Sequence, residues 1–456
     1  MSNSTAAFPP PDRGEHSMHF RAELQSIREH KVPGWYEDAK FGIFIHWGLY
    51  SVPAWAPPTG ELGSIPPEVW FTHNPYAEWY FNSIRVKEGP SWEHHKETYG
   101  EDFPYENFID MWHAEKWNPR EWASLFREAG AQYVVPVTKH HDGFCLWDSA
   151  YTGYNSCRLG PRRDIVSELC RAVRDEGMRF GVYYSGLIDW RWAKRPMRTG
   201  FDVDHPDNIG YDYADYAYNQ VIELINAYKP SLIFNDIGWP YKGEQDLPYL
   251  FAHYYNTVEE GVVDDRWNGI WSDYATKEYH QGEDKVGLAK KWEECRGIGL
   301  SFGYNQVEGD EHLLSPRALV RLVVQTVAAN GNLLINVGPR ADGVIPEQQA
   351  ERLRYLGAWL KQNGEAIYGT RPHNLPRQEL PGGQTVFFTR KEGTVYLLVD
   401  GVKPGTSSFR VKGIGPKDAR ALCDEPVSFG GGEGELEISL SNVPAGAPVL
   451  VFAVRG

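Results

Sequence analysis

The sequence lacks the features that carry a chain into or across a membrane. No run of about 18 apolar residues occurs among its 456 residues, so we expect no transmembrane helix. Residues 1–17 are polar and proline-rich, without a charged start followed by an apolar stretch. Because a secretory signal peptide needs both parts, we recognise none and expect a cytoplasmic protein.

Paired cysteines and basic clusters are also lacking. The cysteines lie far apart and never form a CxxC pair, which favours reduced thiols over a disulfide framework or a zinc site. Asp and Glu outnumber Lys and Arg by 61 to 46, giving a net charge of −15 with no cluster of basic residues. This balance argues against binding nucleic acid and against docking on an anionic membrane. The five cysteines are Cys145, Cys157, Cys170, Cys295 and Cys423.

Aromatic residues, by contrast, are abundant. They make up 14% of the chain, with 17 Trp and 26 Tyr. A large core accounts for more than half of them. The flat face and polar edge of Trp and Tyr also suit stacking against sugar rings, so the surplus is consistent with a carbohydrate site.

Residues 19–372 alternate between short apolar runs and longer amphipathic helices, after a flexible tail expected over residues 1–18. The apolar runs have the continuous hydrophobicity of parallel strands buried on both faces. The helices carry end signals, as where Asn118-Pro119 and Glu121 open one helix and Gly130 ends it. Five or six strands can be assigned, and the repeated order of strand, loop and helix favours a (β/α)8-like, TIM-type barrel. The runs are 41–48, 132–144, 179–186, 231–239 and 332–339, and further helices are expected over 164–177, 315–331 and 346–364.

After Pro372 the pattern changes to short strands of alternating polarity. Residues 385–401 predict two strands joined by a Glu-Gly turn, and 407–413, 434–440 and 448–454 continue the alternation. Short strands separated by Gly- and Pro-rich turns are typical of an antiparallel β-sandwich. We therefore expect a second domain over residues 373–456.

Polar and aromatic residues stand at the ends of several predicted barrel strands. In a (β/α) barrel, catalytic groups lie at the C-terminal ends of the strands and in the loops that follow. These positions therefore form the candidate site, although they are far apart in the sequence. They are His46, Trp47, His140, His141, Asp142, Tyr183, Tyr184, Ser185, Asn235 and Asp236.

The histidines at these strand ends allow more than one interpretation. A single histidine there is often a hydrogen-bonded structural residue. Neutral imidazoles also suit zinc, but no third ligand at a characteristic spacing, such as HExxH, accompanies His140 and His141. Imidazoles that bind sugar hydroxyls need no metal.

Asp236 is a carboxylate at the tip of an apolar strand, before a Gly-Trp-Pro segment. It either caps the following turn or serves as a catalytic group. Hydrolysis of a glycosidic bond needs two carboxyl groups, one to attack or to activate water and one to protonate the leaving oxygen. Spacing alone does not select the partner of Asp236; the candidates are Glu78, Glu278, Glu293 and Glu294.

Several long segments resemble the α-L-fucosidases of glycoside hydrolase family 29. They occur in the same order as in that family and cover about residues 33–370, nearly the whole predicted barrel. Strings of this length and composition are unusual enough to make chance similarity a poor explanation. The segments are WYEDAKFGIFIHWGLYSVPAW, AEWY, YVVPVTKHHDGFCLWDS, NDIGWP, KWEECRGIGLSFGYN and NLLINVGPRADG.

The resemblance implies a catalytic barrel followed by a β-sandwich, and hydrolysis of α-L-fucosides with retention of anomeric configuration. It implies fucosylated glycans or oligosaccharides as substrates, with neither a metal nor an organic cofactor. Residue by residue, Asp236 matches the nucleophile, and Phe234 stands where many members have Trp. The residues that match fucose-binding positions are His46, Glu78, Trp79, His140, His141, Tyr183 and Arg266.

The resemblance also suggests which residue is the acid/base. Glu278 lies in the segment Thr-Lys-Glu-Tyr, which resembles a Thr-Pro-Glu-Tyr element that carries the acid/base in similar enzymes. Lys277 replaces the proline of that element. Glu293 is the alternative acid/base.

Two other interpretations stand beside a retaining fucosidase. One is a metal-dependent hydrolase that uses His46, His140 and His141. The other is a non-catalytic fucose-binding protein, against which the presence of both Asp236 and Glu278 argues, since binding needs no nucleophile. The linkage preference and the oligomeric state, a homo-oligomer included, stay open at this point.

Overall fold

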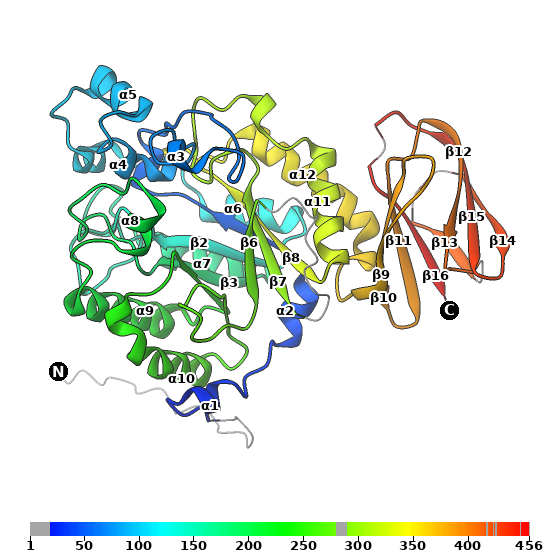
Figure 1. The fold of residues 1–456 in the computed structure, drawn as a ribbon, viewed down its shortest axis with the longest axis horizontal. Helices are drawn as coiled ribbons and strands as arrows, with labels where there is room; N and C mark the ends of the chain where they lie inside the picture. Colours follow the sequence, from blue (N-terminus) through cyan, green and yellow to red (C-terminus); the bar gives the residue numbers. More distant parts are fainter. Residues whose placement is uncertain are drawn as a thin grey trace, which may run out of the picture.

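The computed structural model describes residues 19–279, 290–415, 418–422, 424, 426–446 and 448–455. It has two parts that lie side by side (Figure 1): a larger one with a central sheet among helices, and a smaller one made of strands. The tail expected over residues 1–18 lies outside the described residues.

A single eight-stranded sheet forms the centre of the larger part, and all its neighbouring strands are parallel. Its order is β5-β4-β3-β2-β1-β8-β7-β6, so the chain order runs around the sheet and β1 lies beside β8. This is the cyclic order of a (β/α)8 barrel, left unpaired between β5 and β6 in the described residues, and it confirms the predicted fold class. The strands are β1 (Phe41–Ile45), β2 (Tyr133–Lys139), β3 (Arg179–Ser185), β4 (Leu232–Asp236), β5 (Val262–Val263), β6 (Ala275–Glu278), β7 (Trp292–Gly297) and β8 (Gly331–Val337).

Five of these strands coincide with the apolar runs of the sequence, and three do not. β1, β2, β3, β4 and β8 are buried along nearly their whole length, as continuous apolar runs predict. β5 has only two residues, and β6 is half-buried. β7 is buried but carries Glu293, Glu294 and Arg296. Because of these charged residues, a hydrophobicity pattern does not identify it as a strand.

Helices surround the sheet (Figure 1), and their predicted end signals are present. The Asn118 side chain accepts a hydrogen bond from the N–H of Arg120 at the start of α6, and Ser315 accepts one from Ala318 at the start of α11. Glu121, which the sequence places in the opening of α6, accepts a hydrogen bond from the side-chain amide of Asn118 at 2.9 Å. The α-helices are α1 (Leu24–Ile27), α2 (Gly34–Ala39), α3 (Pro67–Trp70), α4 (Tyr80–Ser83), α5 (Pro90–Tyr99), α6 (Pro119–Glu128), α7 (Ile165–Asp175), α8 (Gly200–Asp204), α9 (Tyr211–Tyr228), α10 (Leu247–Thr257), α11 (Pro316–Ala328) and α12 (Glu347–Asn363). The 3₁₀ helices are η1 (Leu49–Ser51), η2 (Ala77–Trp79), η3 (Tyr105–Met111), η4 (Tyr241–Asp246), η5 (Asp310–His312) and η6 (Gly364–Ala366).

The smaller part consists of two antiparallel sheets packed around an apolar core, as the alternating pattern predicts. One sheet has the order β13-β16-β11-β10-β9, and the other β12-β15-β14. Glu392 and Gly393, with φ of 49° and 79°, form the tight turn expected between β10 and β11. The predicted boundary at residue 373 falls inside β9 and stays a prediction. The strands are β9 (Arg371–Glu379), β10 (Thr385–Lys391), β11 (Thr394–Asp400), β12 (Gly405–Lys412), β13 (Ala419–Ala421), β14 (Val427–Gly432), β15 (Glu435–Val443) and β16 (Leu450–Arg455).

The β-sandwich rests against α11 and α12 of the barrel (Figure 1). The indole N–H of Trp359 on α12 donates to the carbonyl of Val449 at 2.9 Å. Asp400 at the end of β11 forms ion pairs with Arg317 and Arg321 of α11, at 3.4 and 3.2 Å. These contacts join the sandwich to two helices on the side of the barrel.

Two expectations about composition concern the described residues only. No helix within them is both long enough and apolar enough to cross a membrane. Their four cysteines, Cys145, Cys157, Cys170 and Cys295, are free thiols, and Cys157 alone among them is not buried. Cys423 lies outside the described residues.

Candidate active site

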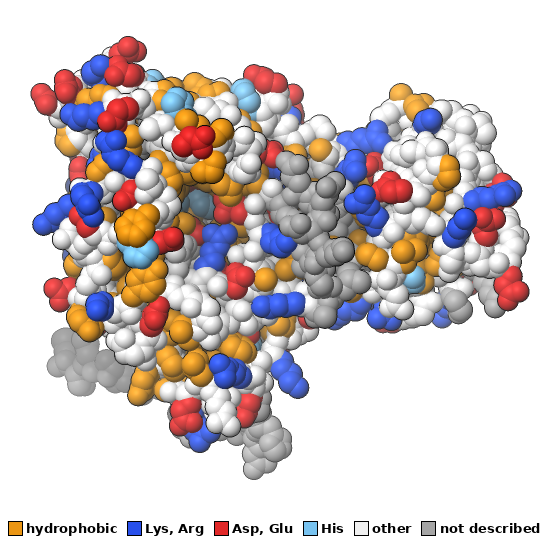
Figure 2. All heavy atoms as spheres, in the orientation of Figure 1, with side chains coloured by type: hydrophobic (Ala, Val, Ile, Leu, Met, Phe, Trp, Pro, Cys, Tyr) orange, Lys and Arg blue, Asp and Glu red, His pale blue; other side chains and the backbone are white. Residues whose placement is uncertain are grey.

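A pocket opens where the carboxyl ends of the barrel strands meet, which is where the sequence predicts the site. Its volume is about 270 Å³, and it lies in the hollow on the face of the barrel shown in Figure 2. Ligand pockets commonly measure about 300–1,000 Å³, so this one suits a single small ring. Ten residues that the sequence assigned to the site line this pocket: His46, Glu78, Trp79, His140, His141, Tyr183, Phe234, Asp236, Arg266 and Glu278.

Asp236 is the last residue of β4, and its carboxylate is surrounded by donors. Its Oδ2 accepts from the Tyr183 hydroxyl at 2.6 Å, and its Oδ1 accepts from Arg266 and from the N–H of Ile237. Nε2 of His141 lies 3.7 Å from Oδ2. Burial alone would raise the pKa of Asp236, but the Arg266 charge and these hydrogen bonds hold it below its ordinary value. Asp236 is therefore an ionised carboxylate at neutral pH.

The backbone turns sharply just after Asp236. Ile237 has a φ of 62°, in the left-handed region that β-branched residues avoid, and Gly238 has a φ of 113°. Such strain persists only where the surrounding structure fixes it. Here the turn directs the N–H of Ile237 onto Oδ1 of Asp236 at 2.8 Å, so the strained residue helps to orient the carboxylate.

Arg266 joins Asp236 to the second carboxylate of the pocket. It lies in the helix-free connection between β5 and β6, residues 264–274. Its Nη1 donates to Asp236, and its Nη2 donates to Oε2 of Glu278 at 3.2 Å. The guanidinium also lies over the Phe234 ring, 5.0 Å from its centroid. One cation thus holds both candidate catalytic groups.

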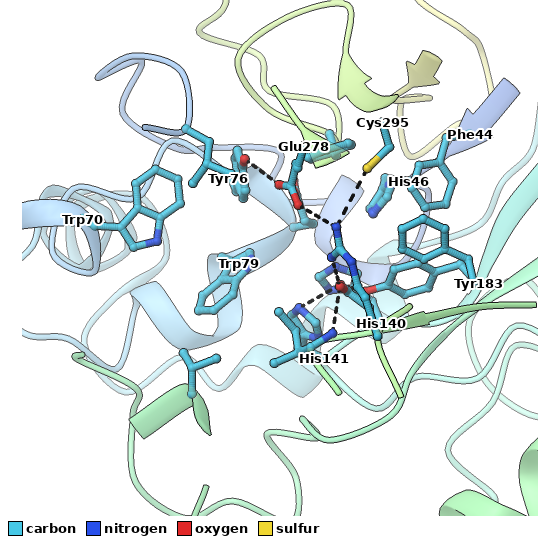
Figure 3. A pocket seen from close by; sticks show the side chains of 18 of the residues that line it. Phe44, His46, Trp70, Tyr76, Trp79, His140, His141, Tyr183, Glu278 and Cys295 are labelled. Carbon is cyan, nitrogen blue, oxygen red and sulfur yellow. Dashed lines mark hydrogen bonds and ion pairs between the residues drawn. The ribbon is translucent and has the colours of Figure 1, made fainter. Parts of the chain in front are cut away.

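Glu278 is the last residue of β6 and has a different electrostatic setting from Asp236. Its Oε1 accepts from the Tyr76 hydroxyl at 3.0 Å (Figure 3). Burial raises the pKa of Glu278; Arg266 opposes the rise, and the negative charge of Asp236 adds to it. The pKa values of the two carboxyl groups are therefore shifted in opposite directions. The shift favours the ionised form of Asp236 and the protonated form of Glu278, which is the pattern of an acid/base pair.

The three imidazoles of the pocket are buried and neutral. Nδ1 of His46 is hydrogen-bonded to Oδ1 of Asn336 at 2.7 Å, and Nδ1 of His141 to the Ser185 hydroxyl at 2.6 Å. Nδ1 of His140 is buried and has no hydrogen-bond partner among the residues that the structure describes. Burial lowers the pKa of His46 and of His141 to about 4, and it lowers the pKa of His140 well below the ordinary value. Buried neutral rings of this kind can both donate to and accept from the hydroxyls of a ligand.

Glu78, in η2, is a third carboxyl group of the pocket. Its Oε2 accepts from the Ser301 hydroxyl at 3.1 Å and from the N–H of Gly303 at 2.8 Å. Burial raises its pKa to about 7, against the effect of these hydrogen bonds. Near neutral pH, Glu78 can therefore donate to a ligand hydroxyl as well as accept from one.

Aromatic rings give the pocket an apolar side. The Phe44 and Phe234 rings lie 5.0 Å apart, and the Tyr183 ring stacks on Phe234 at 5.9 Å. Trp79 lies edge-on to the His141 ring at 5.4 Å (Figure 3). The pocket thus presents polar groups and apolar rings to the same small volume, which is what one sugar ring with a methyl substituent requires.

Glu293, the alternative acid/base, is not brought into this pocket. It is the second residue of β7, fully buried, and its Oε2 accepts from the hydroxyls of Tyr36 and Tyr133. Burial raises its pKa to about 7, while those two hydrogen bonds oppose the rise. Glu294, the next residue of β7, is also buried and does not line the pocket.

Several lining residues were not predicted from the sequence. Tyr76 and Phe302 contact the site from loops, and Val203 and Asp204 come from α8. The only sequence signal for Tyr76 is its place two residues before Glu78. The α8 residues carry no such signal, because a short helix outside the barrel pattern brings them to the mouth of the pocket.

The histidine cluster also bears on the metal-dependent alternative. The His140 ring centroid lies 5.5 Å from that of His46 and 4.1 Å from that of His141. In the part of the chain that the structure describes, no group of three or more His, Cys, Asp or Glu is arranged to hold a metal ion.

Comparisons with known proteins agree with this geometry. Residues 11–365 match the family model described as α-L-fucosidase. An α-L-fucosidase of Dictyostelium discoideum is 33% identical over 398 residues, which cover 84% of this chain and 81% of that protein. Thermotoga maritima α-fucosidase in complex with fucose is 48% identical, with a TM-score of 0.86, over 95% of this chain and 99% of that one. Thermotoga maritima α-fucosidase in complex with a mechanism-based inhibitor is also 48% identical, with a TM-score of 0.87, over 96% of this chain and 100% of that one. The chain therefore belongs to the α-L-fucosidase family of glycoside hydrolases.

Proposed function

We propose that the chain hydrolyses terminal α-L-fucosides of oligosaccharides or glycoconjugates with retention, by double displacement through a covalent fucosyl-enzyme. The observation that carries this proposal is the pair Asp236 and Glu278, which share contact with Arg266 and whose pKa values are shifted in opposite directions, that of Asp236 lowered by Arg266 and that of Glu278 raised by burial. One side chain in contact with both favours the spacing of about 5–5.5 Å of retaining enzymes over the about 6.5–9.5 Å of inverting ones. The relatives solved with fucose and with a mechanism-based inhibitor support the same assignment.

In the first step, an ionised oxygen of Asp236 attacks the anomeric carbon and forms an ester with the fucose. The bond between that carbon and the leaving oxygen breaks, and Glu278 gives its proton to the leaving oxygen. Asp236 thereby loses its negative charge while Glu278 gains one. Arg266, which contacts both, keeps one anionic partner throughout, so the charge transfer leaves no cation unpaired in the buried site.

In the second step, Glu278 removes a proton from water, and the water oxygen attacks the same carbon from the side that the leaving group vacated. The ester bond breaks, and Asp236 becomes a carboxylate again. The Tyr183 hydroxyl, 2.6 Å from Oδ2, donates to that returning charge. Two successive inversions give retention of the α configuration.

Recognition of fucose is assigned to the other lining residues. The imidazoles of His46, His140 and His141, together with Glu78, bind the ring hydroxyls. Phe234 and Trp79 pack against the 6-methyl group, which distinguishes fucose from L-galactose. The 6-hydroxyl of L-galactose would meet these apolar rings without a hydrogen-bond partner. Apolar pockets of this kind favour the sugar without the hydroxyl by about 10–200-fold.

We expect the purified protein to release nitrophenol from 4-nitrophenyl α-L-fucoside with a kcat/KM about 10–200-fold above that for the α-L-galactoside. NMR of the first turnovers should show α-L-fucose before its mutarotation. A strong chelator should leave the rate unchanged, because no step of the proposed mechanism uses a metal. Inactivity on this fucoside and on fucosylated oligosaccharides, or β-L-fucose as the first product, would overturn the proposal.

The dependence of kcat/KM on pH should be bell-shaped, because the reactive form has Asp236 ionised and Glu278 protonated. Activity rises as Asp236 loses its proton, with a midpoint below the ordinary aspartate pKa of about 3.9. It falls as Glu278 loses its proton, with a midpoint above the ordinary glutamate pKa of about 4.3. The basic limb should vanish in Glu278→Gln and persist in the matched variant Glu78→Gln; the reverse result would assign that limb to Glu78.

A further inference from the structure

The leaving group of the substrate has no room inside the pocket. At about 270 Å³ the cavity suits one ring, so the rest of a fucosylated glycan must lie beyond the mouth. One side of that mouth is α8, which contributes Gly200, Val203 and Asp204 to the lining. These three residues have the i, i+3, i+4 spacing of one helix face, so that face is the edge of the pocket.

Next to this face, Phe201 of α8 and His205, the residue that follows α8, present a pair of stacked rings to solvent. Phe201 and His205 are four residues apart, and their rings stack with centroids 4.3 Å apart and an interplanar angle of 18°. Phe201 is 70% exposed. Tyr241, at the start of η4, extends the row: its ring centroid lies 6.3 Å from that of His205, and the residue is 51% exposed. We name these three residues, Phe201, His205 and Tyr241, the aromatic ledge.

The ledge is continuous with the pocket. Figure 2 shows hydrophobic side chains and a histidine gathered over α8, beside the hollow. Apolar groups that are exposed next to one another, rather than singly, can mark a ligand-binding surface. Flat rings at the edge of a sugar pocket are suited to stacking on the next sugar rings of the same substrate. Asp204, exposed between pocket and ledge, can accept from sugar hydroxyls and disfavours an anionic sugar there.

We propose that the aromatic ledge binds the leaving-group part of the substrate, and that this part is a neutral oligosaccharide of at least two sugar residues. The inference rests on the proposed fucosidase function and adds the class of leaving group to it. The first sugar beyond the fucose lies at the mouth beside Val203 and Asp204, and the following sugars stack on Phe201 and Tyr241.

The test compares kcat/KM for fucosides that differ only in the leaving group: nitrophenol, one sugar, a disaccharide and a tetrasaccharide. The oligosaccharides are tried with α-1,2, α-1,3, α-1,4 and α-1,6 linkages, and the linkage that is cleaved fastest is used. In the double variant Phe201→Ala/Tyr241→Ala, we expect a loss of about 10-fold with the disaccharide and tetrasaccharide, because two stacking surfaces are removed. Nitrophenol and the single sugar should show no loss, which also demonstrates that the variant is folded. Tyr355→Ala, which removes an exposed aromatic ring of α12, is the matched control and should change none of the rates.

The outcomes separate this inference from the function on which it rests. A wild type that cleaves none of the compounds refutes the fucosidase proposal itself. A wild type that cleaves the nitrophenyl fucoside but no oligosaccharide, or an equal rate loss with every leaving group, refutes the ledge alone. Light scattering completes the test: if the double variant loses a subunit contact while its rates are unchanged, the ledge is an interface between copies of the chain.

Discussion

Replacing Asp236 with glycine is expected to reduce the hydrolysis of 4-nitrophenyl α-L-fucoside on the order of 10⁴-fold. The variant removes the only group proposed to attack the anomeric carbon, so the covalent intermediate cannot form. It also removes the anion that Arg266 and Tyr183 contact, leaving their donors directed at a vacated position beside the substrate. A small anion can enter the space that the carboxymethyl group occupied.

Azide provides the decisive measurement on this variant. Sodium azide should restore release of nitrophenol from Asp236→Gly, and the product should be β-L-fucosyl azide, because a single displacement inverts the α configuration. Wild-type protein should show neither acceleration nor this product. Circular dichroism of the variant should match the wild type. A folded Asp236→Gly that keeps most of its activity without azide would show that Asp236 is not the nucleophile.

The barrel could be predicted from the sequence only where hydrophobicity marks its strands. β1 to β4 and β8 are apolar and buried on both faces, so a continuous run identifies each of them. β5 is too short for any pattern, β6 is half-buried, and β7 carries charged residues although it is buried. Its Glu293 accepts hydrogen bonds from Tyr36 of α2 and Tyr133 of β2, contacts that no local pattern records. The three missed strands therefore follow one another, next to the unpaired edge of the sheet.

Some residues of the candidate site could be predicted from the strand pattern, and others only from the family resemblance. The strand-end rule alone locates His46, His140, His141, Tyr183 and Asp236, because each follows or ends a visible strand. Arg266 and Glu278 lie on the part of the barrel without a hydrophobic signal, and the family resemblance was needed to assign them.

Contacts between distant segments could not be predicted at all. The hydrogen bond from Tyr76 to Glu278 joins residues 202 positions apart. The strained φ of Ile237 depends on packing that no local pattern records. Both features place hydrogen-bond donors on the catalytic carboxylates and so affect their pKa values. The sequence therefore indicates which residue types form the site, but it does not indicate which carboxyl group is protonated.

Glu278→Ala should be the second most damaging substitution, and its effect should depend on the leaving group. General acid catalysis contributes about 10²–10⁴-fold, so kcat/KM for a fucosylated oligosaccharide should fall by that factor. The fall should be smaller for nitrophenyl fucoside, since nitrophenolate departs with little help from a proton. Hydrolysis of the intermediate also loses its base, so azide should accelerate turnover by attacking the fucosyl-enzyme.

The configuration of the azide product distinguishes the two carboxyl groups. Attack on the fucosyl-enzyme is a second inversion, so Glu278→Ala should yield α-L-fucosyl azide, whereas Asp236→Gly yields the β product. Glu293→Gln is the matched control. It is a buried glutamate one strand away, outside the pocket, and its tyrosine partners can still donate to the amide oxygen. We expect Glu293→Gln to keep wild-type kinetics and to form no fucosyl azide. Formation of the α azide by Glu293→Gln, with normal kinetics in Glu278→Ala, would transfer the acid/base role to Glu293.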